Sequence, residues 1–155
     1  MSEVPIRVWR VGRSSESLYV LLLRDDKGAL LPMTIGPCEA VAIWSALQTE
    51  ARETTPRRPE THDLLCTLIE RLGGRLVKVV VDDLWNRVYF AKLHLEVDGT
   101  PVTVDTRPSD AVAIALRLGA PLFASSAVLE AASEAEDPSE PAPGDLGPDL
   151  NLDDL

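Results

Sequence analysis

Cysteine is scarce in this sequence, which has two among its 155 residues, Cys38 and Cys66. Neither belongs to a CxxC pair or to another spacing typical of metal ligands, which excludes the common zinc motifs. Each lies among apolar residues of a predicted helix. We therefore expect two buried free thiols.

Long hydrophobic runs are also absent. No apolar stretch approaches the roughly 18 residues that are needed to span a bilayer. The first ten residues, MSEVPIRVWR, lack the charged start and the apolar stretch of a signal peptide. We expect a soluble cytoplasmic protein with no membrane partner.

The C-terminal end lacks positive charge. Arg117 is the last basic residue, and nine acidic residues follow from Glu130 onward. The remaining 16 acidic residues are balanced by all 15 basic residues, so the rest of the chain is almost neutral. Proline, glycine and acidic residues dominate the end of the chain and cannot bury enough apolar surface to offset chain entropy. The sequence predicts one domain over 1–132 and a disordered acidic tail over 133–155.

Strong basic clusters are absent as well, although nucleic-acid-binding proteins usually carry a basic patch or stripe. The densest basic stretch holds Arg52, Arg57 and Arg58 and is interrupted by Glu53. It is either a solvated loop or a phosphate-binding patch.

Short apolar runs separated by turn signals fill most of the first 132 residues. Proline at the first helical position and glycine after the last predict where several helices begin and end. Asp98-Gly99 is a hairpin signal. Strands are expected around Ile6–Val11, Leu18–Leu23, Leu30–Ile35, Leu76–Val81, Val88–Val97 and Val102–Val104, and helices from Pro37 to near Thr49, from Thr61 to Gly73, from Pro108 to Gly119 and from about Ser126.

Thr61 is expected to cap the second helix, in which Leu64, Leu65, Leu68, Ile69 and Leu72 form an apolar stripe. The strands that end at Val81 and begin at Val88 are expected to connect across residues 83–86. The pattern as a whole indicates an α+β (mixed α/β) domain with one mostly antiparallel sheet packed by three to four helices.

The first and third helices begin with similar sequences. Residues 35–43 (IGPCEAVAI) and 106–114 (TRPSDAVAI) each follow a strand, place proline at the first helical position and place an acid, Glu39 or Asp110, at the third. Such an acid stabilises a helix N-terminus without any catalytic role. Alternatively, the two junctions converge, and their carboxylates together with Asp105 hold Mg²⁺ or Mn²⁺. Arg107 would then grip a phosphate beside an acid that binds metal. Equally, Asp105 and Arg107 could pair only with each other or with a neighbouring segment.

A second group of polar residues surrounds the start of the second helix, in the segment RRPETHD that runs from Arg57 to Asp63. His62 could act as a general acid or base that Asp63 or another acid orients. The alternative is that Thr61 and Asp63 serve the helix end and His62 bonds to the backbone.

At these residues the sequence resembles the bifunctional nuclease domain family. Three blocks carry the resemblance, Leu31–Ala40, Arg58–Leu65 and Asp105–Arg117, and they occur in the family's order. The resemblance implies a mixed α/β domain that self-associates, and an activity on DNA and RNA that is attributed to plant members. The motif residues carried over are Glu39, His62, Asp63, Asp105, Arg107, Ser109 and Asp110.

Two functions are therefore expected. The first is a nuclease of low sequence specificity that cleaves DNA or RNA with the assistance of Mg²⁺ or Mn²⁺. Its expected catalytic residues are His62, Asp63, Asp105 and Asp110, its substrate-binding residues Arg57, Arg58, Arg107 and Ser109, and its metal ligands Glu39, Asp105 and Asp110. The second is a non-catalytic, self-associating binding or regulatory module in which the same motifs build helix ends.

Overall fold

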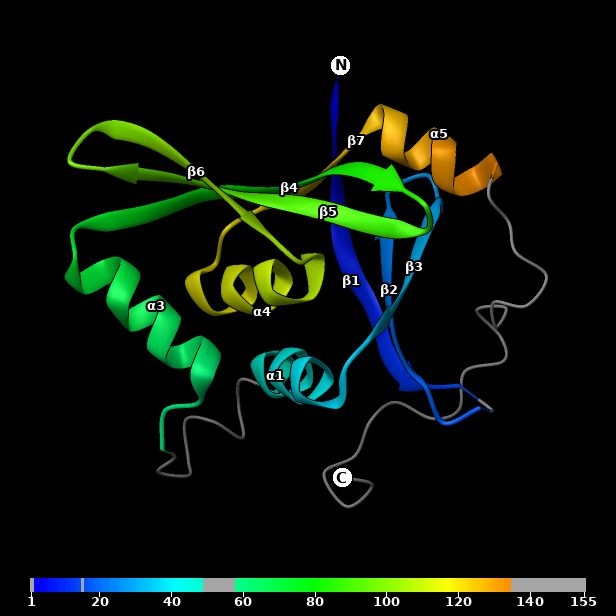
Figure 1. The fold of residues 1–155 in the computed structure, drawn as a ribbon, viewed down its shortest axis with the longest axis horizontal. Helices are drawn as coiled ribbons and strands as arrows, with labels where there is room; N and C mark the ends of the chain where they lie inside the picture. Colours follow the sequence, from blue (N-terminus) through cyan, green and yellow to red (C-terminus); the bar gives the residue numbers. More distant parts are fainter. Residues whose placement is uncertain (1, 15, 49–57, 135–155) are drawn as a thin grey trace.

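The computed structural model describes residues 2–14, 16–48 and 58–134 (Figure 1). In chain order the elements are β1 (Glu3–Arg13), β2 (Tyr19–Asp25), β3 (Leu30–Ile35), α1 (Pro37–Leu47), α3 (Thr61–Arg71), β4 (Gly74–Trp85), β5 (Val88–Val97), β6 (Thr100–Thr106), α4 (Pro108–Leu118), β7 (Leu122–Ser125) and α5 (Ser126–Glu134).

In the part of the chain that is described, seven strands form one sheet in the order β3-β2-β1-β7-β4-β5-β6. The strand β7 is late in the sequence but central in the sheet, where it pairs antiparallel with β1 and parallel with β4. The other pairings are antiparallel. The predicted α+β class, with a mostly antiparallel sheet and helices packed on it, is confirmed.

The helices α1 and α4 lie side by side, and α4 packs on β4 and β5 while α3 packs against α4 (Figure 1). Small residues allow this close approach: Ala40 of α1 and Ala111 and Ala113 of α4 are fully buried. The alanines shared by the two similar helix starts are therefore contact residues between packed helices. This packing fixes the position of the N-termini that carry the candidate site.

The hairpin at Asp98-Gly99 is confirmed, since both residues have a positive φ and connect β5 to β6. The predicted connection across residues 83–86 is wrong. Strand β4 continues to Trp85, and the turn is Asn86-Arg87, with φ of 51° and 64°. Two consecutive residues of positive φ are typical of a type I′ turn, which matches the twist of a two-residue hairpin.

Two further predictions need correction. Glu60, not Thr61, is the N-cap of α3: its side chain accepts a hydrogen bond from the third helical residue, and Asp63 accepts one from the Glu60 backbone. Of the two thiols, Cys66 is buried but Cys38 is exposed, because it lies on the outward side of the first turn of α1.

The apolar stripe of α3 does not face the core. Leu64, Leu65, Leu68 and Leu72 are all exposed, by 38 to 75%. Ile69 is the member of the stripe that packs against the core cluster. The helix buries His62 and Cys66 instead, so the side of α3 that meets α4 is less apolar than the side that meets solvent.

The predicted loop around Arg52 and Arg57 lies outside the described residues, as does the predicted acidic tail except for Ser133 and Glu134, the last residues of α5. Among the helices that are described, none is long and apolar enough to cross a membrane.

Candidate active site

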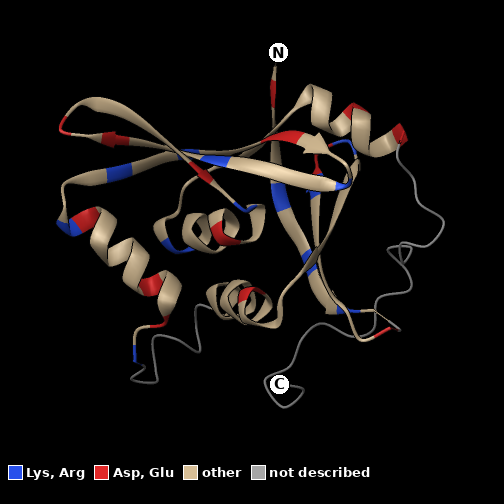
Figure 2. Ribbon diagram, in the orientation of Figure 1, with Lys and Arg blue, Asp and Glu red and all other residues tan. Residues whose placement is uncertain are grey.

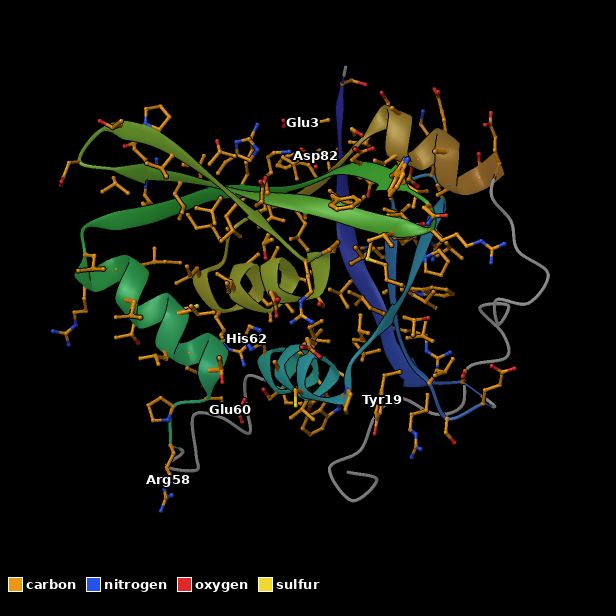
Figure 3. All side chains as sticks on the ribbon, in the orientation of Figure 1. Glu3, Tyr19, Arg58, Glu60, His62 and Asp82 are labelled. Atoms are coloured by element: carbon orange, nitrogen blue, oxygen red, sulfur yellow. The ribbon has the colours of Figure 1, made fainter. Side chains whose placement is uncertain are left out.

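Three helix N-termini meet at one place. The first turns of α1, α3 and α4 supply Glu39, His62 and Asp110, and Arg107 is the N-cap residue of α4. Proline at the first helical position, Pro37 in α1 and Pro108 in α4, fixes where two of these helices begin. Figure 3 shows His62 at the N-terminal end of α3, beside α1 and α4.

A chain of short hydrogen bonds connects these side chains. The Nε2 atom of His62 lies 2.9 Å from Oδ1 of Asp110. The other carboxylate oxygen of Asp110 accepts a hydrogen bond from Nε of Arg107 at 2.8 Å, and Nη2 of Arg107 donates to Oε1 of Glu39 at 2.7 Å. Arg107 thus connects Glu39 of α1 to Asp110 of α4. The two similar helix starts therefore converge, which was one of the two alternatives that the sequence left open.

The four side chains differ in exposure. The side chains of His62 and Glu39 are 10% and 15% exposed, that of Asp110 is 24% exposed, and that of Arg107 is 66% exposed. The bonded chain therefore runs from a buried imidazole to a guanidinium that solvent and ligands can reach.

The carboxylate at the centre is held in its charged form. Burial raises the pKa of the Asp110 carboxyl, but the hydrogen bonds from Arg107 and His62 outweigh burial, and the pKa lies below its usual value. The same contacts, with Asp110 first and Glu39 second, raise the pKa of Arg107 above its already high ordinary value. Asp110 is consequently an acceptor at neutral pH.

The acceptor role of Asp110 determines the tautomer of His62. A carboxylate that faces Nε2 requires a proton on that nitrogen, so the neutral ring carries its lone pair on Nδ1. A histidine held in this way by a carboxylate is the arrangement used for general acid–base chemistry.

Asp63 is engaged by a residue that the sequence did not single out. Its Oδ1 accepts a hydrogen bond from Nε of Arg117 at 2.8 Å. The Arg117 side chain is 5% exposed, and its Nη1 donates to the backbone carbonyls of Ala42 and Ala113 at 2.9 Å each. One guanidinium thus joins α1, α3 and α4 beside the candidate site.

A signal for Arg117 was present in the sequence: it is the only charged residue between Asp110 and Gly119, in an otherwise apolar helix. A charge in the middle of a buried stripe requires a partner. Sequence alone could not identify that partner as Asp63, which lies 54 positions away.

The remaining predicted site residues lie elsewhere or are covered. The side chain of Asp105 is 90% exposed and lies 3.9 Å from Lys92, on β5, whereas Ser109 is buried at 6% exposure. Arg58 is exposed just before α3, and Arg57 lies outside the described residues. The roles predicted for these four residues stay predictions.

The predicted metal ligands do not gather as a metal site in this arrangement. Arg107 occupies an oxygen of Glu39 and an oxygen of Asp110, where a cation would need both carboxylates. Asp105 belongs to a different contact, with Lys92. Over residues 2–14, 16–48 and 58–134, no group of three or more His, Cys, Asp and Glu side chains could hold a metal ion. As arranged, these residues fit a guanidinium better than Mg²⁺ or Mn²⁺.

Comparison with known proteins gives the family. The model of the bifunctional nuclease domain matches residues 20–137, which include all four members of the hydrogen-bonded chain. Uncharacterized protein Rv1829 of Mycobacterium tuberculosis is 45% identical over 130 residues, which cover 83% of this chain and 74% of that protein.

Plant proteins match at greater distance. Bifunctional nuclease 2 of Arabidopsis thaliana is 29% identical over 109 residues, which cover 68% of this chain and 32% of the plant protein. Bifunctional nuclease 1 of Oryza sativa subsp. indica is 29% identical over 108 residues, which cover 66% of this chain and 31% of that protein. The chain therefore spans about a third of each plant relative. From the domain match and the mycobacterial relative together, the chain belongs to the bifunctional nuclease domain family.

Proposed function

We propose that this protein hydrolyses phosphodiester bonds of DNA and RNA with low sequence specificity, and that His62, Asp110 and Arg107 carry the reaction. The observation that carries the proposal is the hydrogen-bonded chain from His62 through Asp110 to an exposed Arg107. It combines a proton-transfer group with a cation suited to phosphate. Membership of a nuclease family supports the same substrate class.

The proposed chemistry gives each group a separate role. Asp110 accepts the Nε2 proton of His62 in a hydrogen bond, which leaves the Nδ1 lone pair to take a proton from the attacking water. The water oxygen forms a bond to phosphorus, the bond from phosphorus to the leaving oxygen breaks, and the imidazolium returns a proton to that oxygen. Arg107 has five N–H groups, of which two are used by Asp110 and Glu39. The others are available for the phosphate oxygens.

Metal assistance is a separate part of the proposal. A divalent cation, when bound, would polarise the phosphate and activate water. Glu39 and Asp110 would have to release Arg107 to hold it, so we propose metal assistance only as a rearranged state. The cleavage assay tests it by comparing Mg²⁺, Mn²⁺ and EDTA.

The sharpest test exploits the two histidines of the chain. Highly purified His62→Gln and His94→Gln are compared with the unaltered protein on single- and double-stranded DNA and RNA. General acid–base groups contribute roughly 10²- to 10⁴-fold, so His62→Gln is expected to lose at least a hundredfold. His94 alternates on β5 with Leu93 and Leu95, which face the core, so it lies on the other face of the sheet. His94→Gln is the matched control that should retain full activity. Equal activities in the two variants would refute the assignment of His62.

A second function is favoured by a different observation. The exposed leucines of α3, Leu64, Leu65, Leu68 and Leu72, form an apolar stripe on a helix that already buries its other side. The edge strand β6 is exposed along nearly its whole length and carries the exposed Val102 and Val104. Contiguous exposed apolar surface commonly marks an interaction site. We propose that α3 and β6 carry the contact of a self-associating module, whether or not the protein is catalytic.

Self-association is tested by measuring mass in solution by light scattering. Leu68→Glu, in the middle of the stripe, should convert an oligomer to a monomer, whereas Leu18→Glu, at an exposed leucine before β2, should leave the mass unchanged. A monomeric unaltered protein at high micromolar concentration would contradict this second function.

A further inference from the structure

The face of the β1–β2 pair that points away from α1 and α4 carries three arginines and a tryptophan beside two buried residues of β2, Val20 and Leu22. Strand alternation puts Ile6, Val8 and Val11 of β1 in the core cluster or packed against it. Arg7 alternates with these residues and therefore points to the other face. Its direct partner on β2 is Arg24, which points the same way.

A β-bulge enlarges this face. The register between β1 and β2 shifts between Val8 and Arg10, so that Trp9 is an extra residue in β1. Since Val8 and Val11 both turn inward, Trp9 and Arg10 lie consecutively on the outer face. Bulges commonly re-aim a side chain in this way next to functional sites. Arg7, Trp9, Arg10 and Arg24 are called the Trp9 face below.

The charges of the Trp9 face are of one sign. Arg7 and Arg24 are directly opposite each other across the strand pair, and like charges in that position oppose folding. Within the described residues of β1, β2 and β3, alternation puts one carboxylate on this side of the sheet, Glu3. Lys78 binds it at 2.7 and 2.8 Å. Figure 2 shows the basic residues spaced along β1.

The aromatic residue is available to a ligand. The guanidinium of Arg24 lies 5.2 Å from the ring centroid of Trp9, yet Trp9 remains 40% exposed. A cation held against an indole keeps the ring in place and puts a phosphate donor beside a stacking surface. Aromatic rings flanked by basic side chains are what proteins use to hold unpaired bases and their phosphates.

We propose that the Trp9 face binds single-stranded nucleic acid, with an unpaired base stacked on Trp9 and phosphates held by Arg7 and Arg24. The inference extends the proposed nuclease function, because it names a single-stranded substrate and puts its binding surface on the sheet face opposite the packed helices. Duplexes bind less well, because their bases are already stacked inside.

The net charge of the whole chain does not oppose this proposal. The formal charge is −10, but nine of the acidic residues lie from Glu130 onward, and the rest of the chain is almost neutral. Before Glu130, 16 acidic residues are balanced by 15 basic residues, so net charge in this part of the chain does not outweigh the arginines of the Trp9 face.

The test measures binding apart from cleavage. Fluorescence anisotropy follows the full-length protein as it binds labelled dT20, rU20 and a 20-base-pair duplex in EDTA and low salt. Trp9→Ala is expected to weaken single-strand binding by roughly 5- to 150-fold, the range of one lost stacking contact, and Trp9→Phe should restore most of it. Arg7→Gln/Arg24→Gln should reduce the slope of log K against log salt by about 1.4, or about 0.7 for each phosphate contact.

The matched control removes the same charge elsewhere. Arg71→Gln/Arg75→Gln alters two exposed arginines at the end of α3 and the start of β4, and it should bind as the unaltered protein does. Circular dichroism and thermal unfolding confirm that each variant is folded.

Two outcomes would overturn the proposal: no binding of either single strand by the unaltered protein at low salt, or equal losses in the Trp9-face and control variants. Binding that is specific to the Trp9 face without any cleavage would support this inference and reject the nuclease function, so the two proposals can fail independently.

Discussion

Arg117→Met removes the guanidinium that joins α1, α3 and α4 and keeps a side chain of similar length. The change takes away the 2.8 Å contact with Asp63, the 3.7 Å contact with Glu60 and the hydrogen bonds to the carbonyls of Ala42 and Ala113. Removing one member of a buried ion pair costs about 3–5 kcal/mol. The side chain of Asp63 is 22% exposed, and solvent lowers the cost, so we expect about 3 kcal/mol.

Urea unfolding measures this loss, and thermal unfolding converts it to a fall of about 10 °C for a domain of this size. Arg75→Met is the matched control, because Arg75 and Glu96 are exposed and 3.5 Å apart. Exposed pairs of this kind contribute about 0–1 kcal/mol. Removal of both charges, in Asp63→Asn/Arg117→Met, should cost less than the sum of the single changes. A midpoint for Arg117→Met equal to that of Arg75→Met would show that the buried guanidinium contributes no more to stability than an exposed one.

Two smaller predictions concern the candidate site. The pKa of Asp110 is lowered by folding, so its contribution to stability is present above roughly pH 3.9 and is lost as the pH falls through the lower folded value. The melting-temperature difference between the unaltered protein and Asp110→Asn should shrink as the pH falls below about 4; a difference that is unchanged or larger at about pH 3 than at about pH 5 would contradict this. In Gly36→Ala, the added Cβ would meet the Glu39 carboxylate, which must swing away from Arg107. We expect a melting temperature within about 2 °C and a reduced cleavage rate, and an unchanged rate would show that Glu39 does not position Arg107.

The local signals in the sequence predicted most of the elements. Pro37 and Pro108 fixed the starts of two helices, and the residues of β5 were predicted from Val88 to Val97 as observed. The prediction from sequence failed for elements whose place in the fold depends on pairing with a segment distant in the sequence. The short run Leu122-Phe123 gave no sign that it would become the central strand, because its pairing with β1 and β4 is entirely non-local.

The same limit applies to the candidate site. The similarity of the two helix starts left two alternatives open, acids that only stabilise separate helix ends and acids that converge, and it could not decide between them. Periodicity showed that α3 is amphipathic but could not show which side meets α4, and the leucine stripe proved to be exposed. His62 was expected to be oriented by Asp63 or another acid, and the acid that it contacts is Asp110 of α4. Asp63 instead accepts a hydrogen bond from Arg117 of the same helix.

The most direct test of the proposed nuclease function is single-turnover cleavage of labelled single-stranded DNA and RNA by Asp110→Asn. The control is Asp105→Asn, which removes a carboxylate of the same β6–α4 segment that lies outside the hydrogen-bonded chain. We expect at least a tenfold lower rate for Asp110→Asn, with a melting temperature within a few degrees of the unaltered protein, and an unchanged rate for Asp105→Asn. Full activity in folded Asp110→Asn would show that the hydrogen-bonded chain from His62 to Arg107 does not carry the reaction.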